Sequence, residues 1–350
     1  MNINSLPLVG KMIVGVSISL VIFSIFVLNS IASFLFPAYY FYVILAIIAF
    51  LVFYFIDFEI LEIFSTHLYL FSIILLLLPI IFGQVTRGAV RWVEFGGYTL
   101  QPSEIAKPFL FLFASVQIAK IKKMSIRKFL FFFGTLFLPL ILIFFQPSLG
   151  VAIITLVGFL GALLGRGIPV KQFVFLLAIL VILLPVFWLI LAPYQKDRIT
   201  AFLNPWFDPL GQGYNSIQSM ISVASGGIFG RGLGKGVQTQ LAFLPERHTD
   251  FIFAAIGEEL GFIGSFAILA LFSVFFWLIL QIQSIARQTS RRCFASCVFV
   301  SLFAQTSVHI GMNLGLLPVT GLPLPLVSAG GSALLGTSII LGIFLSMLRR

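Results

Sequence analysis

Long apolar runs separated by short polar breaks are the feature that most constrains this chain. Each run is about as long as the roughly 20 residues that an α-helix needs to cross the ~30 Å hydrocarbon core of a membrane. Hydrophobic residues make up 60% of the 350 residues and charged residues only 9%, whereas about a quarter of a soluble domain is charged. Disordered chains are also excluded, because they are poor in apolar residues. The sequence therefore predicts an all-α, polytopic membrane protein.

The polar breaks divide the chain into about ten predicted transmembrane helices. We place these spans at residues 12–34, 40–56, 67–82, 103–119, 129–145, 149–164, 173–192, 250–280, 294–316 and 330–348. A long outer loop, 193–249, separates the seventh span from the eighth. We expect residues 1–350 to form a single integral membrane domain that contains this loop.

The distribution of basic residues predicts the orientation of the chain. The net charge is +10, which in a soluble protein would suggest a nucleic-acid partner. In a membrane protein, Lys and Arg instead gather in cytoplasmic segments. Ten spans place both termini on one side, and the segments on that side carry most of the basic residues, including a cluster at 120–128. We therefore expect cytoplasmic termini, an extracytoplasmic loop at 193–249 and no nucleic-acid partner.

Glu104 and Lys107 are ionisable residues at the start of the fourth span. Ionisable groups at membrane depth are costly and are functional candidates by default. A spacing of three residues puts both on one helix face, where they can pair. The pair is either a salt bridge that anchors the helix or a charged wall of an outward-facing pocket.

Asp250 begins the eighth predicted span and follows Glu246, Arg247 and His248. An aspartate at this position can be a simple helix cap. A partly desolvated carboxylate at a water–lipid boundary can also act as a general base. Farther along the same span, the adjacent pair Glu258–Glu259 requires partners that the sequence does not identify.

Two irregular segments complete the pattern. Glycines alternate with other residues across 226–236, which indicates flexible turns or a backbone nest for phosphate, although the spacing matches neither a Walker A loop nor a dinucleotide fingerprint. Residues 317–328 are apolar but rich in proline, so they cannot form a straight helix. We interpret them as a re-entrant lid over an outer cavity. Carboxylates and cations around such a cavity suit an anionic, membrane-borne substrate, acted on by an enzyme or moved by a transporter.

Several motifs in this order resemble the SEDS family of cell-wall proteins, which includes RodA and FtsW. They are RW at 91–92, QPSEIAK at 101–107, DPLG at 208–211, GY at 213–214, QS at 218–219, GG at 226–227, LPERHTDFIF at 244–253, EELG at 258–261, GLLPVTG at 315–321, LP at 324–325, Ser328 and GGS at 330–332. The segment QTQL at 238–241, before FLPERH, is more similar to the RodA branch than to the FtsW branch.

This resemblance implies a peptidoglycan glycosyltransferase with ten transmembrane helices, which polymerises lipid II at the outer face of the bacterial cytoplasmic membrane for cell elongation and shape. Asp250 is then the catalytic residue that deprotonates the attacking hydroxyl. The substrate-binding residues that we assign are Glu104, Lys107, Arg91, Arg247, His248 and Ser148. Basic groups, with a divalent cation such as Mg²⁺ or Mn²⁺ as an open alternative, would stabilise the departing pyrophosphate. A class B penicillin-binding protein is the implied partner.

The sequence departs from the family pattern at three places. Ser148 stands where relatives carry Asp, Ala329 replaces a common Tyr, and segment 29–40 lacks a basic residue that relatives often have. The departures at Ser148 and in segment 29–40 concern how the pocket balances its charge and whether a cation site is intact. Two alternatives stay open: a lipid II flippase without chemistry, and an FtsW-like polymerase of division.

The orientation can be tested with fused reporters. Alkaline phosphatase inserted within 193–249 should be active, because it folds outside the cytoplasm, and a cytoplasmic fluorophore fused after Arg350 should fluoresce. Active phosphatase at Arg350 would reverse the predicted orientation.

Overall fold

The computed structural model describes residues 6–86, 89–121, 126–168 and 188–349, together with 171, 174, 178, 181, 182 and 185. The chain divides into two compact units. The larger unit comprises Met1–Arg166, Ala267–Thr306 and Leu322–Arg350, and the smaller unit comprises Gly167–Phe266 and Ser307–Gly321. The expectation of one integral membrane domain stays a prediction.

Nine of the ten predicted spans correspond to helices within the described residues. They are α1 (Leu6–Ile31), α2 (Phe36–Phe55), α4 (Ser65–Phe82), α5 (Pro102–Lys120), α6 (Ile126–Phe145), α7 (Leu149–Arg166), α12 (Ile252–Ile285), α13 (Thr289–Asn313) and α14 (Gly331–Ser346). The seventh predicted span, 173–192, lies largely outside the described residues. Two short helices, η2 (Ser33–Leu35) and α3 (Phe58–Ile63), join the first three spans.

Six of the described helices, α1, α2, α4, α7, α12 and α13, are long and apolar enough to cross a membrane. Residues Phe132–Phe145 of α6 and helix α14 are shorter apolar helices. Large apolar side chains stay exposed along α1, α2 and α4, as Phe26, Ile44 and Ile74 illustrate. Lipid covers such surfaces in a membrane, so this exposure fits an all-α, multi-pass membrane protein.

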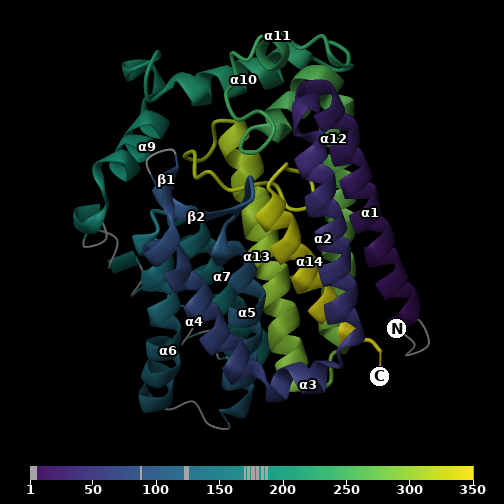
Figure 1. Ribbon diagram of the computed structural model, residues 1–350, viewed down its shortest axis with the longest axis vertical. Helices are drawn as coiled ribbons and strands as arrows, with labels where there is room; N and C mark the ends of the chain where they lie inside the picture. The colour runs from purple at the N-terminus through teal and green to yellow at the C-terminus, as the bar shows by residue number, and fades with distance from the viewer. Residues whose placement is uncertain are drawn as a thin grey trace. The chain divides into compact units, whose positions relative to one another are not determined.

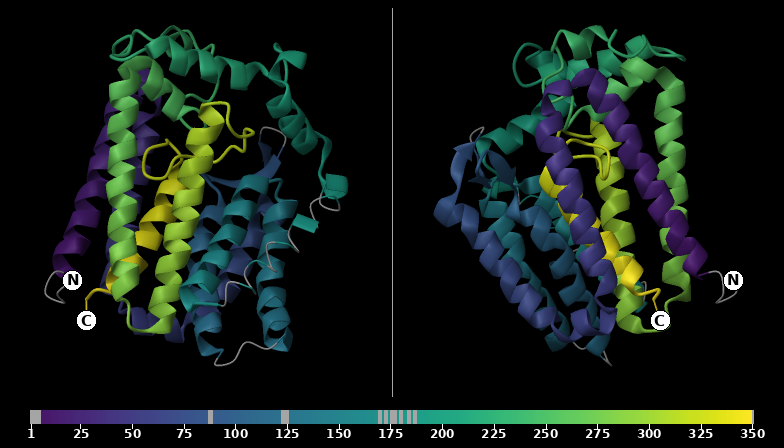
Figure 2. Two further views of the ribbon diagram at one scale, coloured as in Figure 1. Left: turned by 180° about the vertical axis from the view of Figure 1, so that it is seen from behind. Right: turned by 45° about the vertical axis from the view of Figure 1, so that its right-hand side comes forward.

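Helices α5 and α14 form the core of the larger unit. Almost every side chain of α5 and every residue from Ser332 to Ser346 of α14 is buried. Helix α14 lies along α2 and also packs on α5, while α4 and α7 cover other faces of α5 (Figure 1; Figure 2). The central position of α5 matters for function, because its first turn carries Glu104 and Lys107.

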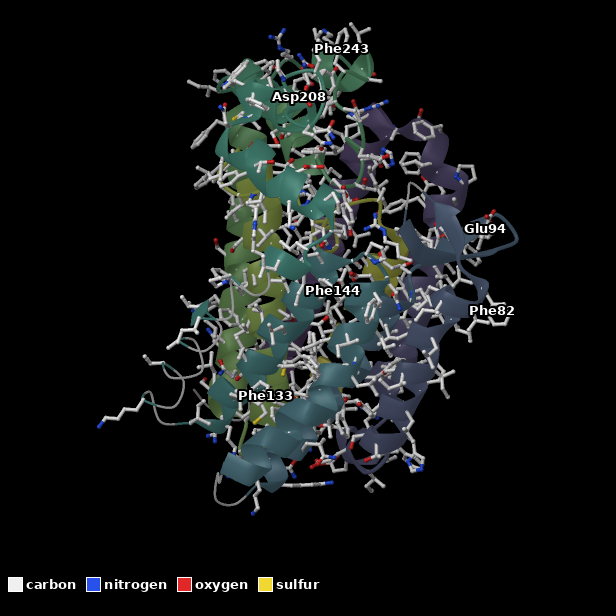
Figure 3. The ribbon with its side chains drawn as sticks, turned by 90° about the vertical axis from the view of Figure 1, so that its left-hand side faces the viewer. Phe82, Glu94, Phe133, Phe144, Asp208 and Phe243 are labelled. Atoms are coloured by element: carbon white, nitrogen blue, oxygen red, sulfur yellow. The ribbon has the colours of Figure 1, made fainter. Side chains whose placement is uncertain are left out.

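A small antiparallel sheet occupies the polar stretch before α5, a difference from the all-helical expectation. It consists of β1 (Gln84–Thr86), β2 (Ala89–Phe95) and β3 (Tyr98–Leu100). The two-residue turn Gly96–Gly97 has positive φ at both positions, the backbone that tight hairpins prefer. Figure 3 shows Glu94 projecting from this hairpin. The pairing satisfies backbone groups that a polar coil would leave to water.

The smaller unit contains the predicted outer loop, which forms helices α9 (Pro193–Leu203), η3 (Pro205–Phe207), α10 (Tyr214–Gly226) and α11 (Val237–Gln240). It also contains the first part of α12, which is not one straight helix as the eighth span was expected to be. Gly261 has non-helical angles, φ 67° and ψ −159°. The amides of Phe262 and Ile263 donate there to carbonyls of Gly227 and Ile228. The glycine-rich segment therefore satisfies the backbone at the break.

Three glycines on one face of α7 allow close packing within the larger unit. A Cβ on Gly161 would lie 2.7 Å from the Ser296 carbonyl oxygen, and one on Gly165 would lie 2.7 Å from the Cys293 Cα. Gly158 faces the Phe111 ring in the same way. Small residues at four-residue spacing let membrane helices approach closely, so this face holds α7 against α13.

Replacing Gly161 with Val should therefore destabilise the protein by about 1–3 kcal/mol, the typical cost of overpacking. The matched control is Gly134→Val on α6, where nothing lies within 4 Å of an added Cβ. Thermal unfolding in detergent, followed by size-exclusion chromatography, should show a lower midpoint for Gly161→Val only. Equal midpoints for the two variants would contradict close α7–α13 packing.

Candidate active site

Glu104 and Lys107 form a buried ion pair in the larger unit. The Lys107 ammonium lies 2.7 Å from Glu104 Oε2, and the two side chains are 5% and 3% exposed. Lys107 also donates to Gln305 Oε1 at 3.4 Å, and Gln305 Nε2 donates to the Pro323 carbonyl at 2.8 Å. The structure thus confirms the predicted pairing and extends it, through Gln305 of α13, to the proline-rich segment.

The second oxygen of the Glu104 carboxylate, Oε1, is buried and has no hydrogen-bond partner among the described residues. A buried carboxylate oxygen without a partner carries a desolvation penalty. Glu104 Oε1 can therefore still accept a hydrogen bond, at a depth where ionisable groups are rare. If the ion pair served stability alone, a hydrogen bond to this oxygen would make the protein more stable.

The entry to α5 is held by two further contacts. The Gln101 amide donates to Ser332 Oγ at 2.8 Å. The Gln101 side-chain amide donates to Ser148 Oγ at 3.2 Å, and Ser148 is only 2% exposed. The structure therefore places Ser148, which replaces the family aspartate, beside the N-terminus of the helix that carries the ion pair. Its role in binding substrate stays a prediction.

Asp250 lies in the smaller unit, in a tight turn that precedes α12. The backbone amides of Thr249, Asp250 and Phe251 all donate to the Glu246 carbonyl at 3.1–3.2 Å. Glu246 adopts a positive φ of 51°, which closes the turn. Asp250 is partly exposed, whereas the following residues, from Phe251 on, are buried. The carboxylate therefore sits at the boundary between accessible surface and the packed start of the helix.

Arg198 and Gly321 are the neighbours of the Asp250 carboxylate that the sequence analysis did not assign. A Cβ built on Gly321 would lie 3.5 Å from Asp250 Oδ2 and 3.7 Å from Arg198 Nη1. The carboxylate and the guanidinium thus both lie close to the position that a Cβ would occupy at residue 321. Because this residue is glycine, no side chain fills that space. Arg198 also donates to the Val319 carbonyl at 3.3 Å. Its position in a helix of the outer loop gave no sequence signal of this proximity.

Asn313, at the end of α13, is the third residue that the sequence analysis missed. It is fully buried, and its side-chain amide donates to the Asp250 carbonyl at 3.0 Å. The only sequence signal was a polar amide at the end of an apolar span.

The other predicted binding residues are less closely defined. His248 Nε2 lies 3.9 Å from Glu246 Oε2, and Arg247 is half-buried beside them in the smaller unit. Arg91 lies on β2 of the larger unit, with its guanidinium 5.9 Å from the centre of the Trp92 ring. Their roles in binding stay predictions.

The buried pair Glu258–Glu259 is bound by residues 234–240, which are the end of the glycine-rich segment and helix α11. Glu258 Oε1 and Oε2 accept from the amides of Gln238 and Thr239 at 2.8 and 3.0 Å. Glu259 Oε1 accepts from the Gly234 amide and from the Gln240 side chain. Within the glycine-rich segment, the amides at 231 and 232 donate to the carbonyls of the same two glutamates, so a phosphate nest is not supported here. The contacts explain how two adjacent carboxylates can be buried.

Among the described residues, no group of three or more His, Cys, Asp or Glu side chains could hold a metal ion. The buried Glu104 carboxylate faces the ammonium group of Lys107. A divalent cation at the site stays a prediction.

The structure thus assembles two clusters, Glu104–Lys107–Gln305 in the larger unit and Asp250–Arg198–Gly321–Asn313 in the smaller unit. The first can stabilise negative charge, because it holds a desolvated ammonium group. The second combines a carboxylate that can accept a proton with a guanidinium that can bind an anion.

Comparison with known proteins identifies relatives over most of the chain. The model of the cell cycle protein family of FtsW, RodA and SpoVE matches residues 4–350. The chain is 40% identical over 290 residues to the peptidoglycan glycosyltransferase MrdB of Escherichia coli K12, covering 81% of this chain and 77% of MrdB. It is 39% identical over 278 residues to the probable peptidoglycan glycosyltransferase FtsW of Buchnera aphidicola, covering 77% and 72%.

Two solved structures have the same fold. A chain from a peptidoglycan synthase complex, in a study of how polymerization and crosslinking are coordinated, matches with a TM-score of 0.84 and 30% identity over 97% of both chains. The rod shape determining protein RodA of Thermus thermophilus matches with a TM-score of 0.74 and 26% identity, over 96% of this chain and 95% of that chain. With its family model, its relatives and its fold in agreement, the chain belongs to the FtsW/RodA/SpoVE family, the SEDS family that its motifs resemble.

Proposed function

We propose that this protein is a peptidoglycan glycosyltransferase that polymerises lipid II into glycan strands at the outer face of the cytoplasmic membrane. Relatives that carry this activity in their names are 40% identical to it. The observation that carries the mechanism is the Asp250 cluster, where a carboxylate and the Arg198 guanidinium approach one open point. This arrangement suits proton removal beside an anionic group.

In the proposed reaction, Asp250 accepts the proton of the 4-hydroxyl of the acceptor GlcNAc. The hydroxyl oxygen then attacks the anomeric carbon of the donor sugar, a C–O bond forms, and the bond to undecaprenyl pyrophosphate breaks. In-line displacement of an α-linked pyrophosphate gives a β-linked product. One base is therefore sufficient, and the pyrophosphate leaves with its electron pair.

Lys107 and Arg198 supply positive charge in this proposal. Lys107 is held in a desolvated setting by Glu104 and Gln305, where electrostatic stabilisation of a departing anion is stronger than in water. We assign Lys107 to the pyrophosphate and Arg198 to an anionic group of either substrate near the base. Arg91, Arg247, His248 and Ser148 complete the proposed binding residues. A divalent cation carried by the substrate pyrophosphate stays a prediction.

Partner and orientation belong to the same proposal. The structure with a TM-score of 0.84 comes from a peptidoglycan synthase complex that coordinates polymerization with crosslinking. We infer that a class B penicillin-binding protein is the partner of this chain, with both termini in the cytoplasm and segment 193–249 outside. We assign the protein to cell elongation, since its loop motif at 238–248 is RodA-like.

A flippase without chemistry is the alternative from a different class. It would require charge along the whole membrane path, whereas Glu104 and Lys107 lie on the first turns of α5 and Asp250 lies just before α12. An FtsW-like division polymerase is the second alternative, and comparison with FtsW relatives at 39% identity does not favour it over the RodA assignment.

Replacing Asp250 with Asn should nearly abolish polymerisation, because Asn is almost isosteric but cannot accept the proton. Loss of a general base typically lowers the rate about 10²–10⁴-fold. Purified protein with its transpeptidase partner should be incubated with lipid II, and glycan strands separated by gel electrophoresis. Co-purification of the partner provides the folding control.

The outcome separates the alternatives. Near-normal strand synthesis by Asp250→Asn would refute Asp250 as the base. If the variant lost lipid II transport in vesicles while wild-type protein made no strands, the flippase assignment would hold instead.

Arg198→Gln should mainly raise the KM for lipid II, since it removes a binding charge and leaves the base in place.

The buried pair gives a second prediction, in which stability and activity separate. Glu104→Gln or Lys107→Met alone leaves one uncompensated buried charge, which typically costs about 3–5 kcal/mol. The double variant should recover much of the thermal stability yet stay as inactive as Lys107→Met, because the ammonium group is still missing. Thermal unfolding and strand synthesis should be measured on all three variants.

The matched control is the ion pair between Glu59 and Arg291 of the same unit, whose carboxylate is 49% exposed. Replacing both of its members with Gln and Met should leave polymerisation close to wild type. Restored activity in the Glu104→Gln/Lys107→Met variant would show that the buried pair is only structural.

A further inference from the structure

Asn313 uses every polar atom of its side chain at the start of α12. Its Oδ1 accepts from the Ala254 amide at 2.9 Å, and its Nδ2 donates to the Asp250 carbonyl at 3.0 Å and to the His309 carbonyl at 2.7 Å. The side chain is 0% exposed. The partners also fix the orientation of the amide, because the opposite assignment would set donor against donor and acceptor against acceptor.

Two of these contacts lie at the proposed base and four residues after it. The first amides of a helix have no partner within the helix, and Asn313 satisfies the one at Ala254. It also binds the carbonyl of Asp250 itself. One side chain thus fixes the backbone from residue 250 to residue 254, because it contacts that backbone at both ends.

Asn313 is itself held in place and begins the segment that returns to the base. Ser219 Oγ donates to the Asn313 carbonyl at 2.8 Å. The chain then leaves α13, and Gly321 brings the returning backbone next to Asp250 Oδ2. Leu244, Phe251 and Ala254 form a buried apolar cluster with Val319, so the turn and the returning segment pack together.

We propose that Asn313 is the positioning residue of Asp250, setting the backbone from which the carboxylate reaches the acceptor hydroxyl. This inference rests on the proposed function of Asp250. Asn313 does not touch the reacting atoms in this proposal. It acts through backbone geometry, and a displacement of about 1 Å at a catalytic group can lower the rate about 10²-fold.

Asn313→Ala should therefore lower kcat for strand synthesis about 10²-fold while the KM for lipid II stays within about 2-fold, since bound substrate and base are no longer aligned. Asn313→Asp should behave similarly, because it keeps the acceptor for Ala254 but places a carboxylate against two carbonyl oxygens. The control is Ser222→Ala, whose hydroxyl binds only Gln218 of its own helix among the described contacts. This control should keep wild-type kcat and KM.

A double-mutant cycle distinguishes positioning from a general structural role. If Asn313 acts through Asp250, adding Asn313→Ala to Asp250→Asn should cause little further loss of the residual rate. A further 10²-fold loss in that background, or unchanged kcat for Asn313→Ala alone, would overturn the proposal.

Ser219→Ala and Asp250→Asn provide the additional controls. If Asn313→Ala does not fold, Ser219→Ala replaces it, because it removes only the hydroxyl bond to the Asn313 carbonyl. A lower kcat with unchanged KM would then support positioning, and an unchanged kcat would refute it. Full activity of Asp250→Asn would refute the proposed function itself, whereas inactive Asp250→Asn with fully active Asn313→Ala would refute only the positioning role.

Discussion

Backbone amides and carbonyls inside a membrane must find partners within the protein, and the rest of this structure depends on that constraint. Regular helices satisfy it by themselves. At several places where this chain leaves the helical form, a buried polar side chain supplies the partner. Gln305 donates to the Pro323 carbonyl, and Asn313 binds the turn before α12. Glu258 accepts from an amide of α11, and Glu259 accepts from an amide of the glycine-rich segment.

This substitution of side chains for helical hydrogen bonds has a functional consequence. Broken backbone allows charged groups to lie at helix ends, where the helix gives them rigid support. Glu104 and Lys107 stand on the first turn of α5, and Asp250 stands just before α12. A site built on helix ends is better positioned for chemistry than one built on a mobile loop. The two clusters therefore have the fixed geometry that the proposed chemistry requires.

Helix α13 contributes to both clusters, with Gln305 in the larger unit and Asn313 in the smaller unit. Neither residue is ionisable, so neither is conspicuous in the sequence in the way that a charged residue within an apolar span is. Both hold other groups in place instead of reacting. Ser148 also contacts a neighbouring group, because its hydroxyl accepts a hydrogen bond from Gln101 at the start of α5.

The positions and types of nine helices followed from the sequence, because hydrophobic length alone decides what can cross a bilayer. The pairing of Glu104 with Lys107 followed from helical spacing, and the family followed from the order of the motifs. The small sheet was missed, since short strands within a polar stretch carry little periodicity.

By itself, then, the sequence determined the membrane class, the helices, the family and the charged residues worth testing, because these depend on composition and on contacts close along the chain. Only the tertiary structure decided which groups surround those residues. The bond of Glu258 to the Thr239 amide, the bond of Arg198 to the Val319 carbonyl and the bond of Asn313 to the Asp250 carbonyl join residues that lie 19 to 121 positions apart. No local pattern encodes such contacts, because they arise only when distant segments pack against one another.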